Sequence, residues 1–180
     1  GSVAGQRGVI LIEPESSFAV RIAEVYASIQ GEGQFAGTPS VFVRTTGCNL
    51  RCWFCDTPFT SWNPEGPHIA ATDLVRQVQE FGIEHVVLTG GEPLLQPDCV
   101  PLCEQLLAAG HFVTIETAGT VFRPAAARLM SISPKLANSA PSKVGSAAAL
   151  RWQTRHEQAR LNHAVIARLI EANEFQFKFV

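Results

Sequence analysis

Three cysteines lie close together in the segment GCNLRCWFCDT, which runs from residue 47 to residue 57. Cys48, Cys52 and Cys55 are separated first by three residues and then by two. A redox pair needs only two thiols, and a closed structural zinc site normally needs four ligands. Three thiols indicate a metal centre that leaves one coordination position open for another ligand.

The residues alone leave other interpretations of these cysteines open. Cysteine is often a small buried apolar residue, but the polar neighbours of these three do not suit a core strand. A zinc site would need a fourth ligand such as His68, because no second Cys-x-x-Cys pair exists. A thioredoxin-type pair of Cys52 and Cys55 would leave Cys48 without a role. Cys99 and Cys103 are expected to be packing residues of a helix.

Composition indicates a globular protein. The chain has 180 residues, of which 46% are hydrophobic and 17% charged, enough for one domain with a buried core. The net charge is −2 with no run of like charge, so we expect neither nucleic acid nor a membrane surface as the main partner. Apolar runs stay well below the roughly 18 residues of a membrane span.

The N-terminal residues 1–17 are expected to form a flexible lead-in, and Gly1-Ser2 is typical of a tag scar. Residues 18–180 are expected to form a single domain. No signal peptide is visible, and the odd count of five cysteines favours free or metal-bound thiols over disulfides. We therefore expect a cytoplasmic protein.

Apolar periodicity predicts alternating strands and helices. A helix is expected from Thr72, with Leu74, Val75, Val78 and Phe81 on one face, and a long helix is expected near 156–172. The segment 138–149 is expected to be irregular. A second helix is expected between Asp98 and Gly110, with Leu102, Cys103, Leu106 and Leu107 inward. Strands are expected at 18–26, 41–43, 85–88, 112–115, 131–133 and 175–180.

The alternation implies parallel β-α-β units, in which ligands bind at the carboxyl ends of the strands. Four motifs follow strands directly: the cysteine segment, TGGEP, ETAGT and SPK. Their loops should meet at one edge of the sheet, which indicates an enzyme. In TGGEP, the paired glycines Gly90 and Gly91 would let the backbone approach a ligand, and Glu92 could pair with an ammonium group.

The spacing C-x3-C-x2-C, with Phe54 before the last cysteine, resembles the cluster loop of radical S-adenosylmethionine (SAM) enzymes. The resemblance implies a modified, incomplete parallel β/α barrel. It also implies a [4Fe–4S] cluster on Cys48, Cys52 and Cys55, with SAM on the fourth iron. Contacts to SAM are then implied for Phe54, Cys55, Asp56, Gly91, Glu92, Ser133, Pro134 and Lys135.

Five motifs narrow the resemblance. SIQGEG, FVRTTGCNLRCWFCDT, TGGEPLLQ, ETAGT and SPK together are similar to the 7-carboxy-7-deazaguanine synthase family over about residues 18–180. Members are lyases that convert 6-carboxy-5,6,7,8-tetrahydropterin into 7-carboxy-7-deazaguanine with release of ammonia, in queuosine biosynthesis, and form homodimers. The resemblance implies a magnesium ion at Thr57. Substrate contacts are implied for Ile29, Gln30, Gly31, Glu32, Arg44, Thr89 and Glu116.

Two features of the sequence depart from the pattern of this family. Ala118 stands where the family often has asparagine, and the chain ends at Val180, before the last barrel segment of the family. Two other functions stay open: a radical SAM activase of a glycyl-radical partner, and a non-enzymatic metal-binding module. A radical SAM enzyme would further need a reductant such as flavodoxin.

Overall fold

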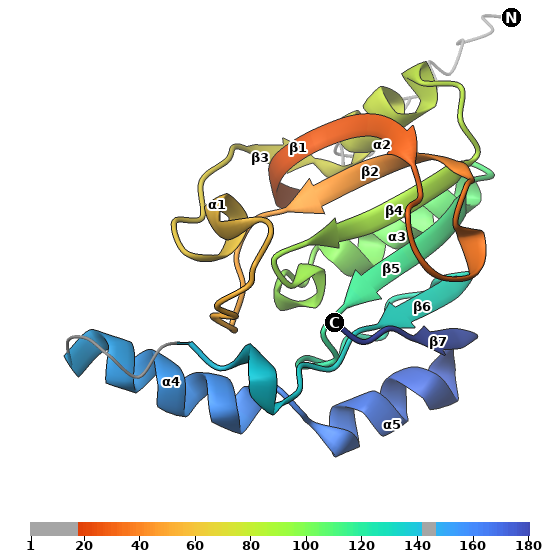
Figure 1. The fold of residues 1–180 in the computed structure, drawn as a ribbon. Helices are drawn as coiled ribbons and strands as arrows, with labels where there is room; N and C mark the ends of the chain where they lie inside the picture. The colour runs from red at the N-terminus through yellow and green to blue at the C-terminus, as the bar shows by residue number, and fades with distance from the viewer. Residues whose placement is uncertain (1–17, 142–146) are drawn as a thin grey trace, which may run out of the picture.

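The computed structural model describes residues 18–141 and 147–180, which form one open seven-stranded sheet with helices packed on it (Figure 1). The strand order is β3-β1-β2-β4-β5-β6-β7. The strands are β1 (Ala19–Ile29), β2 (Pro39–Thr45), β3 (His68–Ala70), β4 (His85–Gly90), β5 (Phe112–Thr117), β6 (Leu129–Ile132) and β7 (Phe175–Phe177). The helices are α1 (Pro58–Ser61), α2 (Ala71–Glu80), α3 (Cys99–Ala108), α4 (Ala147–Ala159) and α5 (His163–Ala172).

The sheet is parallel from β2 to β7 and antiparallel at its other edge. Strand β1 pairs antiparallel with both β2 and β3, and the remaining pairs are parallel. Helices α2 and α3 contact the sheet and each other, and α5 packs on β6. This arrangement confirms the expected modified, incomplete β/α barrel.

Side chains alternate between the two faces of the central strands, because successive residues of a strand point in opposite directions. On β2, Val41 and Val43 join the apolar core, whereas Phe42 and Arg44 line a cavity on the opposite face. The adjacent strands repeat the pattern: Val86, Leu88, Val113 and Ile115 lie in the core, and Thr89 and Glu116 line the cavity. The open face of the sheet therefore carries the polar residues.

Helix α3 confirms the expected packing role of its two cysteines. Cys99 and Cys103 are both fully buried in the core. Burial raises the pKa of the Cys103 thiol to about 12, so the group stays protonated and apolar in character. These two thiols therefore belong to the core of the domain.

Several predicted elements differ from the structure. Helix α2 begins at Ala71, one residue before the predicted cap Thr72, and the short strand β3 was not predicted. The single helix expected over 156–172 is wrong, because it is divided into α4 and α5. The Asn162 side chain accepts a hydrogen bond from the amide of Val165, which caps α5 and starts a new helix.

The expected irregular segment 138–149 is only partly borne out. Its residues 138 and 139 belong to a short 3-10 helix (Ala137–Ser139) and α4 begins at Ala147, while 142–146 lie outside the described residues. The predicted lead-in 1–17 also lies outside them. Within the described parts of the chain, no helix is both long enough and apolar enough to cross a membrane.

Candidate active site

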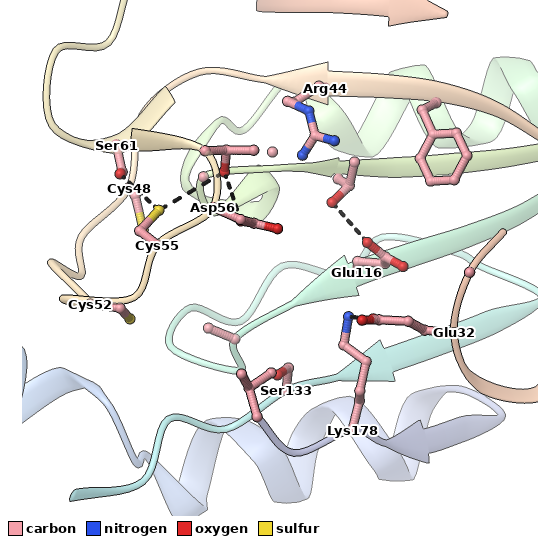
Figure 2. Close-up of a pocket in the computed structure, with 18 of the residues that line it drawn as sticks. Glu32, Arg44, Cys48, Cys52, Cys55, Asp56, Ser61, Glu116, Ser133 and Lys178 are labelled. Atoms are coloured by element: carbon pink, nitrogen blue, oxygen red, sulfur yellow. Dashed lines mark hydrogen bonds and ion pairs between the residues drawn. The ribbon is translucent and has the colours of Figure 1, made fainter. Parts of the chain in front are cut away.

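A cavity of about 490 Å³ lies on the open face of the sheet, at the carboxyl ends of the parallel strands (Figure 2). Residues from all four predicted loops line it, so the expected convergence of these motifs is observed. The predicted site residues that line it are Ile29, Gln30, Gly31, Glu32, Arg44, Cys48, Cys52, Phe54, Cys55, Asp56, Thr57, Thr89, Gly91, Glu116, Ser133 and Lys135.

Arg44 is the fixed cation of the cavity. Its Nε donates to Glu24 Oε1 at 2.7 Å, and a terminal nitrogen donates to the hydroxyl of Tyr26 at 2.8 Å. Desolvation lowers the pKa of Arg44, but the hydrogen bonds to Glu24 and Tyr26 outweigh it and raise the pKa overall. The guanidinium is therefore held in one orientation and stays charged, with further N–H groups available to an anion.

Glu116 is the centre of a polar network on the floor of the cavity. Its carboxylate accepts hydrogen bonds from Gln30 Nε2 at 3.1 Å and from the Thr89 hydroxyl at 2.9 Å. The Gln30 side chain in turn accepts from the amide of Glu32 at 3.3 Å. These contacts join the loop after β1 to the ends of β4 and β5.

The three thiols of the cysteine loop line one end of the cavity, but they do not converge on a point. Figure 2 shows Cys48 and Cys55 close to each other and Cys52 farther along the loop. No group of three or more His, Cys, Asp or Glu side chains among the described residues is arranged to hold one metal ion. A mononuclear zinc site needs converging ligands, whereas each iron of a cluster takes its own thiolate. The spread of the thiols fits a cluster better than zinc.

Two of these thiols have polar neighbours. The Cys48 sulfur accepts from the amide of Leu50 at 3.4 Å, and the Cys55 sulfur lies 3.4 Å from the hydroxyl of Ser61. Burial raises the pKa of Cys48 to about 12, despite the hydrogen bond from Leu50. Binding of a metal to Cys48 must therefore displace a proton from the thiol.

Arg51 fastens the cysteine loop to helix α4. Its amide donates to His156 Nδ1 at 3.1 Å, and its guanidinium lies 3.6 Å from the centre of the Trp152 ring. His156 is fully buried, and its Nε2 lies 2.9 Å from the Ser139 hydroxyl, which donates to the carbonyl of Leu136. Since Nδ1 accepts, Nε2 carries the hydrogen and donates to Ser139.

The glycines of TGGEP serve close packing between loops. Gly90 has φ +146°, and a Cβ on it would lie 2.3 Å from the carbonyl oxygen of Thr45. A Cβ on Gly91 would lie 2.3 Å from the carbonyl oxygen of Gly47. The glycines thus allow the loop after β4 to lie directly against the loop after β2. The sequence predicts a close approach of this backbone to a ligand, and in the structure the close approach is to the neighbouring loop.

Glu92 and Pro134 are the two predicted site residues that do not line the cavity. Glu92 is fully buried, and its carboxylate accepts from the Thr117 hydroxyl at 2.8 Å and the amides of Ala118 and Leu94 at 2.9 and 3.2 Å. Burial raises the pKa of Glu92, although these hydrogen bonds act against the rise. Protein donors therefore occupy the carboxylate that we expected to meet an ammonium group.

Two lysines complete the charge of the cavity. Lys135 Nζ donates to the Ser133 hydroxyl at 2.6 Å, and burial lowers the pKa of Lys135. Lys178 follows β7 and forms an ion pair with Glu32 across the cavity (Figure 2). Lys178 was not predicted, because a lysine in the last strand segment belongs to no motif.

Other lining residues were missed for a similar reason. Tyr26 and Phe42 form a stacked pair with ring centres 5.3 Å apart, and Ser61 faces Cys55. Period-two alternation along β1 and β2 could have found the two aromatic residues. The lining residues without a predicted contact are Tyr26, Ser28, Phe42, Leu50, Ser61, Ala118, Lys178 and Val180, and Gly90, which was expected to approach a ligand, also lines the cavity.

Comparison with known families decides the class of this site. The profile of the radical SAM superfamily matches residues 42–135, which include the cysteine loop and the loops after β4, β5 and β6. The chain belongs to the radical SAM superfamily. Membership implies a [4Fe–4S] cluster and S-adenosylmethionine as cofactors, and a reductant for the cluster. The donor set of the cysteine loop fits this requirement.

Curated relatives of this radical SAM protein share one name. A 7-carboxy-7-deazaguanine synthase of Halobacterium salinarum is 48% identical over 90% of this chain and 64% of its own length. The protein of the same name from Rhodopirellula baltica is 49% identical over 92% of this chain and 63% of its own length. The chain therefore spans a little under two thirds of these relatives.

A solved structure supports the fold alone. The crystal structure of QueE from Escherichia coli matches this radical SAM protein with a TM-score of 0.59 and 23% sequence identity. The match covers 91% of this chain and 84% of that one. Identity at this level carries no argument about residues of the cavity.

Proposed function

We propose that the protein is a 7-carboxy-7-deazaguanine synthase, which converts 6-carboxy-5,6,7,8-tetrahydropterin into 7-carboxy-7-deazaguanine and ammonia in the biosynthesis of queuosine and related compounds. The observation that carries the proposal is the fixed guanidinium of Arg44 facing a cavity that ends at the cysteine loop. The shared name of the 48–49% identical relatives supports the same activity.

The substrate would bind on the open face of the sheet. An arginine fork suits the planar carboxylate of the pterin, and the Tyr26–Phe42 pair offers a flat apolar wall to its ring. Glu116 can accept hydrogen bonds from the ring N–H groups, and Gln30 can both donate and accept. Ile29, Gly31, Glu32 and Thr89 would complete the substrate site.

The cofactors would bind at the end formed by the cysteine loop. Cys48, Cys52 and Cys55 would hold the cluster, and Ser61 would donate to the Cys55 thiolate. Phe54, Asp56, Gly91, Ser133 and Lys135 would contact SAM, with Pro134 shaping their turn. Glu92 would support SAM binding indirectly, by holding the loop that contains Gly91 in place. When bound, these groups supply the one-electron chemistry that removes hydrogen from carbon.

Thr57 is the proposed magnesium ligand. Its hydroxyl lies 3.4 Å from a carboxylate oxygen of Asp56 at the mouth of the cavity. Magnesium prefers oxygen ligands and keeps several water or substrate oxygens, so one threonine is enough as a protein anchor. We further propose a homodimer in the cytoplasm that flavodoxin can reduce; the five free thiols suit a reducing compartment.

The function is tested by mass spectrometry of an anaerobic reaction. The mixture contains the reconstituted protein, dithionite, magnesium, SAM and 6-carboxytetrahydropterin. We expect 7-carboxy-7-deazaguanine to form in excess of 5′-deoxyadenosine, because loss of ammonia makes the conversion redox-neutral and hydrogen taken from the substrate must be returned to it. Formation of 5′-deoxyadenosine without the deazaguanine would overturn the substrate assignment and favour another radical SAM activity, such as that of an activase.

The substrate site is tested separately by Arg44→Ala. This change removes a charge-assisted contact, so substrate binding should weaken about tenfold to a hundredfold while cluster content stays unchanged. Arg128→Ala is the matched control, because Arg128 is exposed at the amino end of β6, away from the cavity. Equal substrate affinity in both variants would show that Arg44 is not the carboxylate partner.

A further inference from the structure

The charge of the chain is unevenly distributed. Residues 117–156 contain none of the sixteen acidic residues but six of the fourteen basic ones. This stretch ends in α4, a helix outside the part of the chain matched by the superfamily profile. A protein with net charge −2 therefore has a basic stretch of sequence, and the part of it in α4 lies beside the cysteine loop. The wide spacing of these basic residues hides the segment from a search for charge runs.

Arginine and tryptophan side chains lie together on the exposed side of α4. Arg151, Trp152 and Arg155 belong to α4, and Trp62 follows α1. We name these four residues the α4 basic face. Arg151, Trp152 and Arg155 line a pocket of about 280 Å³, and both arginines are exposed. Within residues 18–141 and 147–180, neither arginine forms an ion pair. Like charges one helical turn apart repel each other, and an acidic partner would relieve that repulsion.

The α4 basic face is connected directly to the cysteine loop. Arg51, the neighbour of Cys52, lies beneath it, with its guanidinium 3.6 Å from the Trp152 ring centre and 5.8 Å from that of Trp62. In Figure 1, α4 runs below the loop that joins β2 to α1 and extends beyond the sheet. A protein bound here reaches the cysteine loop from outside, without entering the cavity reserved for cofactor and substrate.

Members of the superfamily need a reductant that delivers electrons to the cluster from outside the protein. The cluster must be reduced by one electron before it can cleave SAM, and the exposed arginines would attract an electron carrier with an acidic surface. Arginine and tryptophan are also the residues most enriched among the dominant contacts of protein interfaces. We infer that the α4 basic face is the docking surface for a small acidic electron-transfer protein. The partner loses one electron and the cluster gains it, with no bond made or broken.

Nucleic acid fits this face less well. Single strands bind by stacking bases on exposed aromatic rings within a basic groove. The Trp152 ring already has Arg51 and Arg155 near it, at 3.6 and 5.5 Å from its centre. Since the whole chain is acidic, two exposed arginines suit a compact acidic protein surface better than a phosphate chain.

The test uses the reconstituted full chain and an acidic flavodoxin with its flavin as the probe. The variant Arg151→Glu/Arg155→Glu reverses the charge of the face. The control Arg76→Glu/Arg128→Glu makes the same net change on α2 and at the amino end of β6. Calorimetry with oxidised flavodoxin gives the dissociation constant at two salt concentrations, and the absorbance of the cluster gives its reduction rate by flavodoxin hydroquinone.

We expect Arg151→Glu/Arg155→Glu to weaken flavodoxin binding and slow cluster reduction about tenfold or more, with a weaker salt dependence. Dithionite needs no docking site, so dithionite reduction of the cluster should be unchanged in this variant. The control should match the wild type in every measurement. Because cluster reduction is measured without pterin, the result is independent of the proposed substrate.

Four outcomes would overturn the inference. One is equal loss of flavodoxin binding in both charge-reversed variants, and another is no binding of the wild type to either flavodoxin or an acidic ferredoxin. A change of oligomeric state in Arg151→Glu/Arg155→Glu, seen by sedimentation, would identify the face as a contact between two copies. Tighter binding of a single-stranded oligonucleotide than of flavodoxin would identify a nucleic-acid site.

Discussion

The loops after β4 and β2 lie against each other, yet they are held in place by different kinds of interaction. The glycine loop after β4 is fixed by a buried carboxylate, Glu92, with four hydroxyl and amide donors around it. The cysteine loop after β2 accepts hydrogen bonds from the Glu92 amide and the Thr120 hydroxyl, and it is also held from outside, by stacking of Arg51 on Trp152 and a hydrogen bond to His156. One loop is fixed within the core, and the other is fixed partly by α4, a helix that packs little on the sheet.

This difference separates two roles within one cavity. A loop with a satisfied buried carboxylate forms a rigid wall, because leaving any of its partners unpaired is costly. A loop held by a surface helix can adjust when metal and cofactor bind. The motif TGGEP therefore acts as scaffold as much as binding site, and substitutions of Glu92 and Trp152 can separate the two roles.

The largest effect is expected for Cys52→Ala. This change should abolish iron binding and SAM cleavage while changing the stability of the metal-free protein by less than about 0.5 kcal/mol, because Cys52 is partly exposed. Cys103→Ala is the converse control: it should keep the cluster and lose about 1 kcal/mol or more of stability. Iron analysis and urea denaturation measure both effects. Substantial residual SAM cleavage in Cys52→Ala would contradict the assignment of this ligand.

Glu92→Ala should cost about 3 kcal/mol of stability, because it leaves buried amides and hydroxyls without an acceptor and opens a cavity. Urea denaturation of the metal-free protein measures the loss. Glu104→Ala, at an exposed position of α3, is the control and should change little. A stable Glu92→Ala protein that had lost only SAM affinity would instead show Glu92 to be a direct ligand.

Trp152→Ala should loosen the cysteine loop and leave the glycine loop unchanged. It removes a stacking contact of roughly 1–2 kcal/mol. Hydrogen exchange of the metal-free protein should become faster around residues 48–55 and stay the same around 89–94. Gln158→Ala, exposed on the same helix, is the control. Unchanged exchange in the cysteine loop would mean that α4 does not hold it.

The smallest effect concerns the other end of β4, where His85 lies 2.8 Å from the hydroxyls of both Ser40 and Thr114. Burial lowers the pKa of His85, so the unfolded chain takes up a proton at higher pH than the folded protein. Stability should therefore fall as pH drops below about 6.5, the ordinary histidine value. His85→Gln should reduce that slope, and His68→Gln, on an exposed residue, should not. Equal slopes in all three proteins would exclude His85 as the cause.

The sequence predicted the parallel core and the convergence of four loops because both follow from local patterns. Alternation in β2, β4 and β5, and turns directly after them, left little freedom in the positions of Arg44, Thr89 and Glu116. Elements defined by distant contacts were missed. The short strand β3 is recognisable only by its pairing with β1, and the break before Asn162 depends on a single cap.

The role of Glu92 was missed for a related reason. Its hydrogen-bond partners Thr117 and Ala118 lie about one β-α unit later in the chain, so only the folded sheet brings them to the carboxylate. A motif can name the residue types of a loop without revealing which of them face inward. The same limit applies to Lys178, which reaches the cavity from the last strand segment.

The link between Arg51 and His156 spans 105 residues of sequence, and it sets an order for maturation of the protein. Contacts between neighbouring segments form early in folding, and contacts of long sequence separation form late. The β1–β2 hairpin, with Glu24, Tyr26 and Arg44, belongs to the first group. A nascent chain would thus form the hairpin that carries Arg44 before α4 emerges, and the cysteine loop would be ready for metal only after α4 has formed.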